Sequence, residues 1–343
     1  MLCKKIKRRG GAEQYNADNK CKEALAEAVE ACAEDTKGQT CYICTQALHW
    51  KTKEGLVRMC ACRGTAGFAH VSCLAEQAKI LCDEAEENNL ERQPRFNRWH
   101  TCSLCEQSYL GGVRCALGWA CWKTYAGRPE ADQTGLVDNL RLIAIGVLGS
   151  GLSEAGHHED ALPVKEAELA MLRRCRLPDS LLLAAQSNLA TTYSKLGRRE
   201  EALRMRQDVY SRHVEIYGEE HGDTLAVALC YATSLFESSR FEEAKSLSRK
   251  TMLVARRVLG DNDDRTLRMR WNYARTLYND PTATIDDVRE AVTTLEETER
   301  TARRVLGGAH PSATVIGNSL REARVALLAC EMPDDLAARL RGL

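Results

Sequence analysis

The sequence has little of what several broad classes of protein require. It has no net charge, with 48 basic and 48 acidic side chains, and aromatic residues make up only 6% of it. The charge balance argues against bulk nucleic-acid binding, because such binding requires an excess of lysine and arginine over phosphate. The scarcity of aromatics, beside 28% charged residues, favours a helix-rich protein over an all-β one.

Long hydrophobic runs are also missing. The longest apolar stretch, Leu140 to Leu152, has 13 residues, includes Arg141 and three glycines, and is too short to span a bilayer. The basic run Lys4 to Arg9, a nuclear-import signal or a solvated tail, is not followed by the apolar segment of a secretory signal. We therefore expect no membrane insertion and a reducing compartment, the cytoplasm or the nucleus, where clustered cysteines hold metal more often than they form disulfides.

Cysteine is the residue that the sequence has in excess, and its distribution divides the chain. Thirteen of the 16 cysteines lie at or before Cys121. The 343 residues suffice for about two domains and for a core that needs no disulfides. Composition predicts a polar, partly helical segment, a cysteine-rich module, a helical region with almost no proline, and a tail, in residues 1–38, 39–127, 136–330 and 331–343.

Eight residues of the cysteine-rich module have the spacing of metal ligands. They form the pairs C-x-x-C, C-x-C, H-x-x-C and C-x-x-C, in the order Cys41, Cys44, Cys60, Cys62, His70, Cys73, Cys102, Cys105. Each pair can chelate one ion, and eight ligands fill two tetrahedral sites. Because no position is left open for water, the metal should be structural, and a metalloenzyme is disfavoured. A loop-rich module of this size lacks much apolar core, so the metal should supply its folding free energy.

The internal spacing of these ligands resembles that of the RING-CH (RING-variant) finger. One residue separates Cys60 from Cys62, and seven separate Cys62 from His70, whereas the similar PHD finger usually has a wider third-to-fourth spacing. The resemblance implies two structural zinc ions in a cross-brace. One would be bound by Cys41, Cys44, His70 and Cys73, and the other by Cys60, Cys62, Cys102 and Cys105.

RING-CH fingers generally act as ubiquitin ligases, so the resemblance implies that a ubiquitin-charged conjugating enzyme docks on this module. Such a ligase works by positioning, without a nucleophile of its own. Ile43 and Leu74 match apolar contacts of the family, and Trp99 either fills the same groove or belongs to the core. The chain departs from the family pattern at Gln77, where tryptophan is common, and at Glu106, where strongly active RING fingers carry a basic residue.

Between the sixth and seventh ligands lies an insert of 28 residues, in which we expect a helix from Ser72 to Glu87 with Leu74, Ala78 and Leu81 inward. His100 is a conceivable substitute for Cys102 as a ligand, which the regular pair spacing disfavours. His49 should be an ordinary surface or packing histidine. The remaining thiols near the module should be buried and free: Cys82, Cys115 and Cys121.

The C-terminal part of the sequence repeats itself. The alanine of a charged motif recurs at Ala161, Ala202 and Ala244, which are 41 and then 42 residues apart. A Leu/Tyr-Gly marker follows the same period at Gly218 and Gly260 and returns after five extra residues. A constant period over several copies indicates a solenoid of helix pairs.

Each repeat should consist of two helices. In the second helix the pattern predicts one inward face of Ala244, Leu247, Thr251, Val254 and Val258. Small residues at equivalent places of the first helix should let its partner approach closely: Gly149, Ala190, Ala232 and Ala274.

This combination resembles tetratricopeptide repeats of the kinesin-light-chain type, with about four repeats and a capping helix. Stacked pairs form a groove suited to a protein substrate or peptide. In that family an asparagine of the first helix contacts the cargo backbone. Asn188 and Asn272 match it, whereas Val147 and Cys230 replace it elsewhere.

The sequence thus predicts a mainly α protein, with a small two-zinc cross-brace RING-CH finger followed by a tetratricopeptide-repeat solenoid. The predicted function is a ubiquitin-protein ligase whose finger recruits the charged conjugating enzyme and whose repeats select the substrate. The alternative is a non-catalytic scaffold that uses both regions as binding modules. A reader of histone tails, as in PHD fingers, is disfavoured by the ligand spacing.

Overall fold

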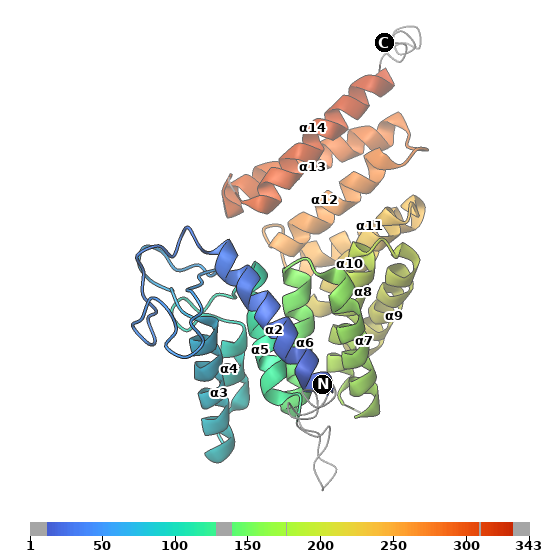
Figure 1. Cartoon of the computed structure of the whole chain (residues 1–343). Helices are drawn as coiled ribbons and strands as arrows, with labels where there is room; N and C mark the ends of the chain where they lie inside the picture. Colours follow the sequence, from blue (N-terminus) through green and yellow to red (C-terminus); the bar gives the residue numbers. More distant parts are fainter. Residues whose placement is uncertain (1–11, 128–138, 176, 309, 332–343) are drawn as a thin grey trace. The chain divides into compact units, whose positions relative to one another are not determined.

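The computed structural model describes residues 12–127, 139–175, 177–308 and 310–331, and within these ranges the chain is helical, with two isolated β-bridges and no β-strand. The predicted mainly α fold is confirmed. The chain divides into two compact units between Leu196 and Gly197. The helices of the first unit (Figure 1) are α2 (Ala12–Ala31), α3 (Val71–Glu87), α4 (Arg92–Phe96), the 3-10 helix η1 (Asn97–Trp99), α5 (Gly111–Tyr125), α6 (Asn139–Glu154), α7 (His158–Arg174) and α8 (Asp179–Lys195). Those of the second unit are α9 (Arg199–Tyr217), α10 (Gly222–Glu237), α11 (Phe241–Val258), α12 (Asp264–Asn279), α13 (Ile285–Leu306) and α14 (Pro311–Glu331).

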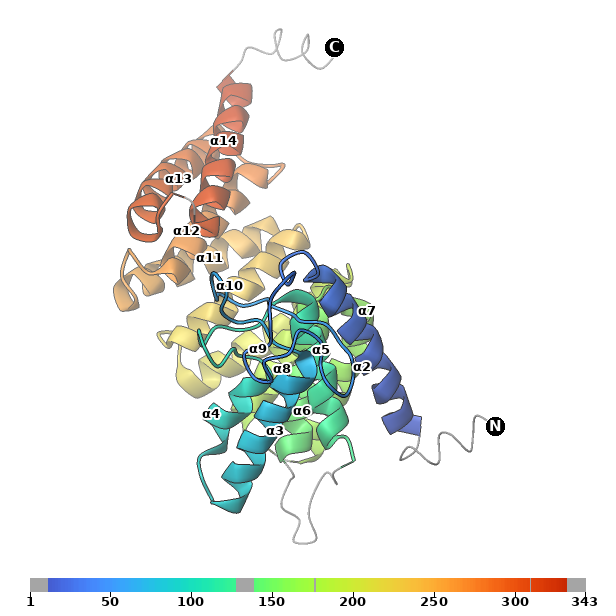
Figure 2. The same ribbon diagram turned by 60° about the vertical axis from the view of Figure 1, so that its left-hand side comes forward.

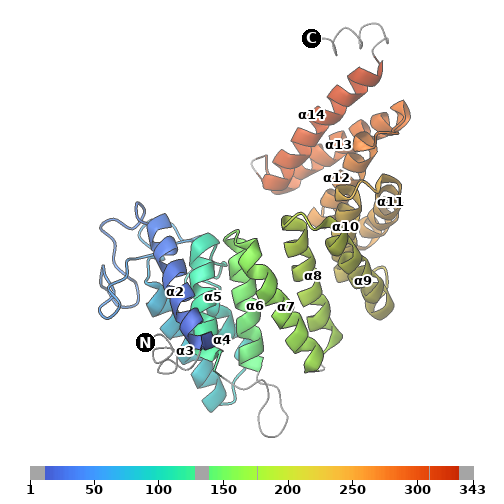
Figure 3. The ribbon, with the colours of Figure 1, turned by 45° about the vertical axis from the view of Figure 1, so that its right-hand side comes forward.

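In the first unit, the cysteine-rich segment is an insertion between two helices of one stack. Helix α2 packs against α5, α5 against α6, and α6 against α7, and Figure 3 shows these helices side by side. The segment 32–110 leaves the stack after α2 and returns to it at α5, while α3 and α4 pack on each other within the insertion (Figure 2). The predicted junction at residues 128–135 lies outside the described residues.

The contact between α5 and α6 depends on glycine. A Cβ atom on Gly118 would lie 3.1 Å from the Leu148 Cα, and one on Gly151 would lie 2.7 Å from the Arg114 carbonyl oxygen. Both obstacles are backbone atoms, which cannot move aside as a flexible side chain can. Two glycines, one from each helix, therefore set how closely α5 joins the helices that follow.

In the second unit, the same backbone turn recurs with the repeat period of the sequence. Gly218, Gly260 and Gly307 stand where the second helix of each pair ends, with φ of +81°, +86° and +90°. A residue with a Cβ adopts such φ values with difficulty. The Leu/Tyr-Gly marker of the sequence is therefore the turn that sends the chain into the next first helix.

The inward faces of the helices carry small residues. Ala190, Ala232 and Ala274 are buried, as predicted, and a Cβ on Gly149 would lie 3.0 Å from the Lys165 side chain. In α11 the predicted face is displaced. Ala244 and Thr251 are buried, but the face is completed by Ser248 and Ala255, and Val258 is exposed. Because the helices approach closely, small residues occupy the contact and the bulkier ones lie beside it.

Two predicted helices can be compared directly with the structure. Helix α2 begins at Ala12, earlier than the expected Cys21. Helix α3 matches the expected range and buries Leu74 and Ala78, but Cys82 rather than Leu81 continues its inward face. None of the helices in the described ranges is long and apolar enough to cross a membrane.

Candidate metal centres

The eight predicted ligands form two groups, the same groups that the resemblance implied. In each group, the four ligand atoms lie within 4.8 Å of one another. Site 1 consists of Cys41, Cys44, His70 and Cys73, and site 2 consists of Cys60, Cys62, Cys102 and Cys105.

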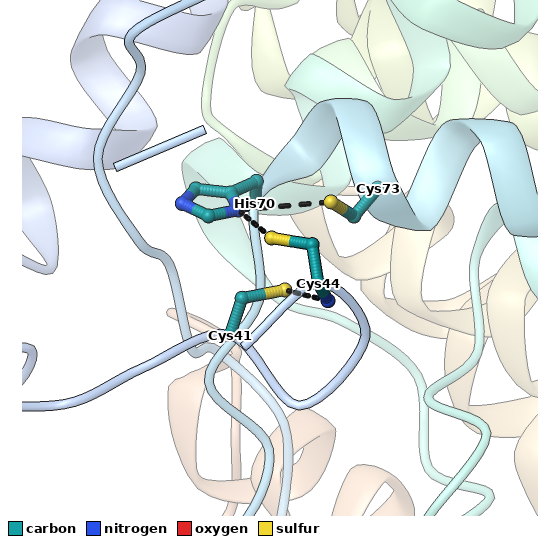
Figure 4. Close-up of side chains that lie close together, drawn as sticks. All are labelled: Cys41, Cys44, His70 and Cys73. Carbon is teal, nitrogen blue, oxygen red and sulfur yellow. Dashed lines mark hydrogen bonds between the residues drawn. The ribbon is translucent and has the colours of Figure 1, made fainter. Parts of the chain in front are cut away.

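Site 1 forms where the N-terminus of α3 meets the first cysteine turn. His70 is the N-cap residue of α3, and Cys73 lies in its first turn. The His70 Nδ1 lies 3.4 Å from the Cys44 Sγ and 3.6 Å from the Cys73 Sγ. Figure 4 shows these side chains and Cys41 turned toward a common centre.

The neighbours of His70 fix the atom that it offers. Its Nε2 lies 3.3 Å from the Ala47 carbonyl oxygen and donates to it, which leaves the Nδ1 lone pair for a metal. Burial lowers the pKa of His70 and favours the neutral ring that a metal requires. His49 is buried with its ring edge-on to His70, at a centroid distance of 5.3 Å, and its Nδ1 bonds Thr52. It is therefore a packing residue.

A carboxylate that was not predicted to matter holds α3 in place. Glu54 is buried, and its Oε1 accepts the backbone N–H of Ser72 at 2.7 Å. Its Oε2 accepts the Ser72 hydroxyl at 2.7 Å and the Thr52 hydroxyl at 2.9 Å. A negative charge at a helix N-terminus is favourable, so Glu54 fastens the helix that carries two ligands of site 1.

The two C-x-x-C pairs adopt the same turn. The Thr45 N–H donates to the Cys41 carbonyl at 2.8 Å, and the Glu106 N–H donates to the Cys102 carbonyl at 3.0 Å. Thr45 and Glu106 have φ of +60° and +57°. The same backbone shape thus occurs once in each site, and it directs both cysteines of a pair toward one point.

Site 2 depends on a glycine that was not predicted either. The Sγ atoms of Cys62 and Cys102 are 3.8 Å apart. Gly67 has φ of +86°, and a Cβ on it would lie 2.6 Å from the Cys62 Cβ. Only glycine fits there, and the spacing of the cysteines contains no signal for it.

The two sites are interleaved along the chain and joined in space. Pairs of ligands alternate between site 1 and site 2. The Tyr42 hydroxyl lies 2.9 Å from that of Ser103, which links the two C-x-x-C turns. An antiparallel bridge between Val57 and Ala69 holds the stretch between the pairs. Each site therefore restrains the loops of the other.

The chemistry of the donors fits a divalent cation in each site. Burial raises the pKa of the Cys60 and Cys73 thiols, and the neighbouring sulfurs add to this effect. Burial is the largest single influence on the Cys105 thiol and acts in the same direction. Hydrogen bonds with the Gln107 and Ala61 backbone and with the Cys62 and Cys102 side chains together outweigh it and lower the pKa of this thiol to about 7. Thiols so close together cannot all ionise without a positive charge between them. A bound cation provides that charge, so both sites could hold a thiophilic metal ion.

His100 does not replace Cys102. Cys102 is one of the four residues of site 2, and His100 is not. Burial and the nearby Arg114 lower the pKa of His100 to about 4, and its Nδ1 is buried without a hydrogen-bond partner among the described residues.

Two of the three residues predicted to contact a conjugating enzyme are inaccessible. Ile43 is 37% exposed, but Leu74 is 4% exposed and Trp99 is fully buried. Trp99 packs edge-on against Tyr125 of α5, so of its two interpretations the structure supports the core. Leu74 faces inward from the first turn of α3. Direct contact of either residue with a partner is therefore contradicted.

A residue that was not predicted is exposed at the equivalent position of the second turn. Leu104 lies between Cys102 and Cys105 as Ile43 lies between Cys41 and Cys44, and it is 51% exposed. Both turns direct the backbone N–H of this residue toward the first sulfur of the pair, at 3.4 Å. The repeated C-x-x-C pattern contained the signal for this residue.

The two predicted groove asparagines have different environments. Asn188 is exposed and lines a polar cavity between α6 and α8. Asn272 is fully buried, and its Oδ1 accepts from Arg275 at 3.4 Å. Asn272 therefore offers no accessible side chain to a peptide, because Arg275 and the neighbouring helices cover it.

Comparison with known proteins identifies the repeats. Residues 182–223 and 224–264 match a family model described as tetratricopeptide repeat, so this region contains such repeats. A search of curated proteins found no match.

The repeats are similar to several solved structures. One is a single-residue variant of a Podosopora anserina protein described as a kinesin light chain with nearly identical TPR-like repeats. It is 22% identical, with 59% of this chain and 93% of that chain covered and a TM-score of 0.48. Another is BtubC (BKLC) from P. vanneervenii, which is 15% identical, with 79% and 89% covered and a TM-score of 0.47.

Proposed function

We propose that the protein is a RING-CH-type ubiquitin-protein ligase whose repeats select the protein to be modified. The observation that carries this proposal is the pair of interleaved four-ligand sites. Their two C-x-x-C turns are joined by Tyr42 and Ser103, and each presents one exposed apolar residue, Ile43 and Leu104.

The metal of both sites is proposed to be zinc. Three thiolates with one imidazole, and four thiolates, are common ligand sets of structural zinc, with bonds of about 2.3 Å to sulfur and about 2.0 Å to nitrogen. Zinc with four protein ligands has no open position for water. Its proposed contribution is to stabilise the loops that Ile43 and Leu104 occupy.

The proposed mechanism is catalysis by positioning. Ile43 and Leu104 would dock a conjugating enzyme that carries ubiquitin as a thioester. The amine of a substrate lysine would attack this thioester, forming an isopeptide bond to ubiquitin and releasing the thiol of the conjugating enzyme. The chain supplies no nucleophile for the step. The repeats would bind the substrate in the cytoplasm or the nucleus.

A transfer assay tests the proposal. The zinc-loaded chain, ubiquitin, activating enzyme, ATP and a panel of conjugating enzymes are combined, and ubiquitin on the chain itself is followed. Ile43→Ala and Leu104→Ala should each lower the rate by about tenfold or more, as expected for anchors at the centre of an interface. Leu48→Ala is the matched control, since Leu48 is 58% exposed and outside both C-x-x-C pairs. No transfer with any conjugating enzyme, by a chain that holds both metal ions, would exclude ligase activity.

One group of observations favours the scaffold instead. Leu74 and Trp99 are buried, which reduces the apolar docking surface. Glu106, which follows the last ligand, places a carboxylate where strongly active RING fingers carry a cation, and the Arg98 guanidinium beside it is 3.7 Å away. If this alternative holds, the metal-loaded chain will show no transfer, and Ile43→Ala will leave its partner binding unchanged.

A further inference from the structure

A cavity lined by polar residues lies in the first unit, outside the two metal centres. It measures about 280 Å³ and lies between α6 and α8, with residues of α7 completing its lining. Figure 3 shows these three helices in succession. Its charged lining residues are Glu154, His158, Lys165 and Lys195.

A buried ammonium group lies at the base of this cavity. Lys165 is 5% exposed, and its Nζ donates to the Ser153 hydroxyl at 2.7 Å, the Thr192 hydroxyl at 2.9 Å and the Asn188 carbonyl at 3.2 Å. These three bonds use every N–H of the ammonium. Thr192 in turn donates to the Asn188 carbonyl, whereas the hydroxyl hydrogen of Ser153 has no acceptor among the described residues. The positive charge polarises that hydroxyl toward any acceptor in the cavity.

Other polar groups around the cavity also lack a protein partner among the residues that the structure describes. The His158 Nδ1 is buried without a hydrogen-bond partner in the described part of the chain. Within the described ranges, neither Lys195, the Asn188 amide nor the Ser150 hydroxyl has a side-chain bond. Burial lowers the pKa of His158, and Lys195 and Lys165 lower it further, which places both cations close to this ring.

Nearby carboxylates offset these cations only in part. The Glu154 carboxylate also interacts with Arg114 of α5. Burial lowers the pKa of Arg114, and the charge of Glu154 raises it in part. Glu168 is the carboxylate that acts on Lys165, and burial raises its pKa to about 7, so near that pH about half of its charge is neutralised. The cavity therefore combines the positive charges of Lys165 and Lys195 with donors that have no partner in the described part of the chain.

We propose that this cavity binds the phosphate group of a phosphorylated serine or threonine in a protein partner. A phosphate carries about two negative charges and three strong acceptor oxygens, whereas a carboxylate has one charge and two oxygens. The donors of Ser150, Ser153, Asn188 and Lys195, which have no acceptor among the described residues, match the larger acceptor set. The inference rests on the proposed role of the repeats in binding a protein, and it makes partner selection depend on phosphorylation.

A peptide array tests the proposal on the full, metal-loaded chain. The peptides carry a fixed central phosphoserine, serine or glutamate among random neighbours. Phosphoserine peptides should retain about tenfold more protein than serine or glutamate peptides, and millimolar inorganic phosphate should displace it. Lys195→Glu should abolish this preference, and Ser153→Ala should weaken it by about threefold while helicity is unchanged.

Lys22→Glu is the matched control, because Lys22 is an exposed lysine of α2 outside the cavity. Equal retention on phosphoserine and serine would overturn the proposal, and so would equal retention on phosphoserine and glutamate. An equal loss with Lys22→Glu and Lys195→Glu would show bulk attraction in place of a site. The array contains neither ubiquitin nor conjugating enzyme, so its outcome is independent of the transfer assay.

Discussion

The metal-ligand segment and the repeats of the second unit are stabilised in different ways. Between α2 and α5 the chain has two isolated bridges, the helix α3 and two short helices, and its loops converge on eight side chains. The repeats instead bury small residues along every helix, such as Ala274 and Ala291. The stability of the first region should therefore depend strongly on each single ligand atom, whereas the folding free energy of the second region is spread over many contacts. Substitutions should accordingly have all-or-none effects in the first and graded effects in the second.

The largest effect is expected from loss of one metal ligand. Cys60→Ser should leave site 2 unable to hold its ion and, because the sites are interleaved, should lower the occupancy of site 1 as well. Structural zinc contributes on the order of 10 kcal/mol to small metal-dependent folds, more than such a segment can replace. Native mass spectrometry should show the metal content falling from two ions per chain to one or none, and near-UV circular dichroism should lose its signal from this segment.

Cys82→Ala is the matched control for this prediction. Cys82 is a buried free thiol of the same segment outside both sites, so the metal content should stay at two ions and the fold should lose only about 1 kcal/mol. Full metal content in the Cys60→Ser protein would contradict the assignment of site 2.

A core substitution in the repeats should be severe but graded. Leu295 of α13 is fully buried in the cluster that includes Leu267 and Leu320. Leu295→Ala should lower the free energy of unfolding by about 3 kcal/mol through lost burial and the remaining cavity. Urea unfolding followed by far-UV circular dichroism measures the change, and the metal content should not respond. Loss of metal in this variant would contradict the comparison between the two regions.

The same contrast explains which features could be predicted from the sequence. Ligand pairs are local, since C-x-x-C directs two sulfurs to one point whatever surrounds it, and the repeat period is a regularity that the backbone must follow. The exposure of a side chain, in contrast, depends on residues distant in the sequence. Leu74 directly follows the ligand Cys73, and Trp99 lies three residues before the ligand Cys102. Trp99 is nevertheless covered by Tyr125 of α5, which the chain reaches only after the last ligand.

The sequence pattern also did not predict which small residues of a helix face inward. In α11, Leu247 and Val254 follow helical spacing as well as Ser248 and Ala255 do, and hydrophobicity alone favours the first pair. Close packing of the helices selects the second. Gly67 and Glu54 were missed for a similar reason, because the contact of each, with Cys62 and with Ser72, depends on how the loops fold and leaves no pattern in the sequence.

The joint between α5 and α6 offers a smaller, directional test. Gly151→Ala places a Cβ 2.7 Å from the Arg114 carbonyl oxygen and should destabilise the first unit by about 2 kcal/mol, an overpacking cost. Gly317→Ala in α14 is the matched control, because its Cβ would meet only the flexible ends of the Glu299 and Arg303 side chains, at 3.4 and 3.9 Å. That change should stabilise the protein by about 0.5 kcal/mol, since alanine favours helix over glycine. Thermal unfolding of both variants gives the two signs, and equal signs would contradict the close glycine contact.

The smallest expected effect concerns the N-terminus of α13, which a capping box closes. The Asp287 carboxylate accepts from Lys245 at 2.7 Å and from the Thr284 hydroxyl at 2.6 Å, and together these lower its pKa to about 2. Since the folded pKa lies below the ordinary one near 4, the stabilisation is complete above pH 4 and is lost as pH falls toward 2. Asp287→Asn should cost about 1 kcal/mol at pH 7, less than the full shift because both side chains of the ion pair are partly exposed. The difference from the unsubstituted protein should vanish near pH 2.

Asp286→Asn, which changes an 86% exposed neighbour, should cost less than about 0.5 kcal/mol at any pH. Urea midpoints at pH 7, 4 and 2 measure both, and a loss for Asp287→Asn that is as large at pH 2 as at pH 7 would show that packing, and not charge, holds this turn.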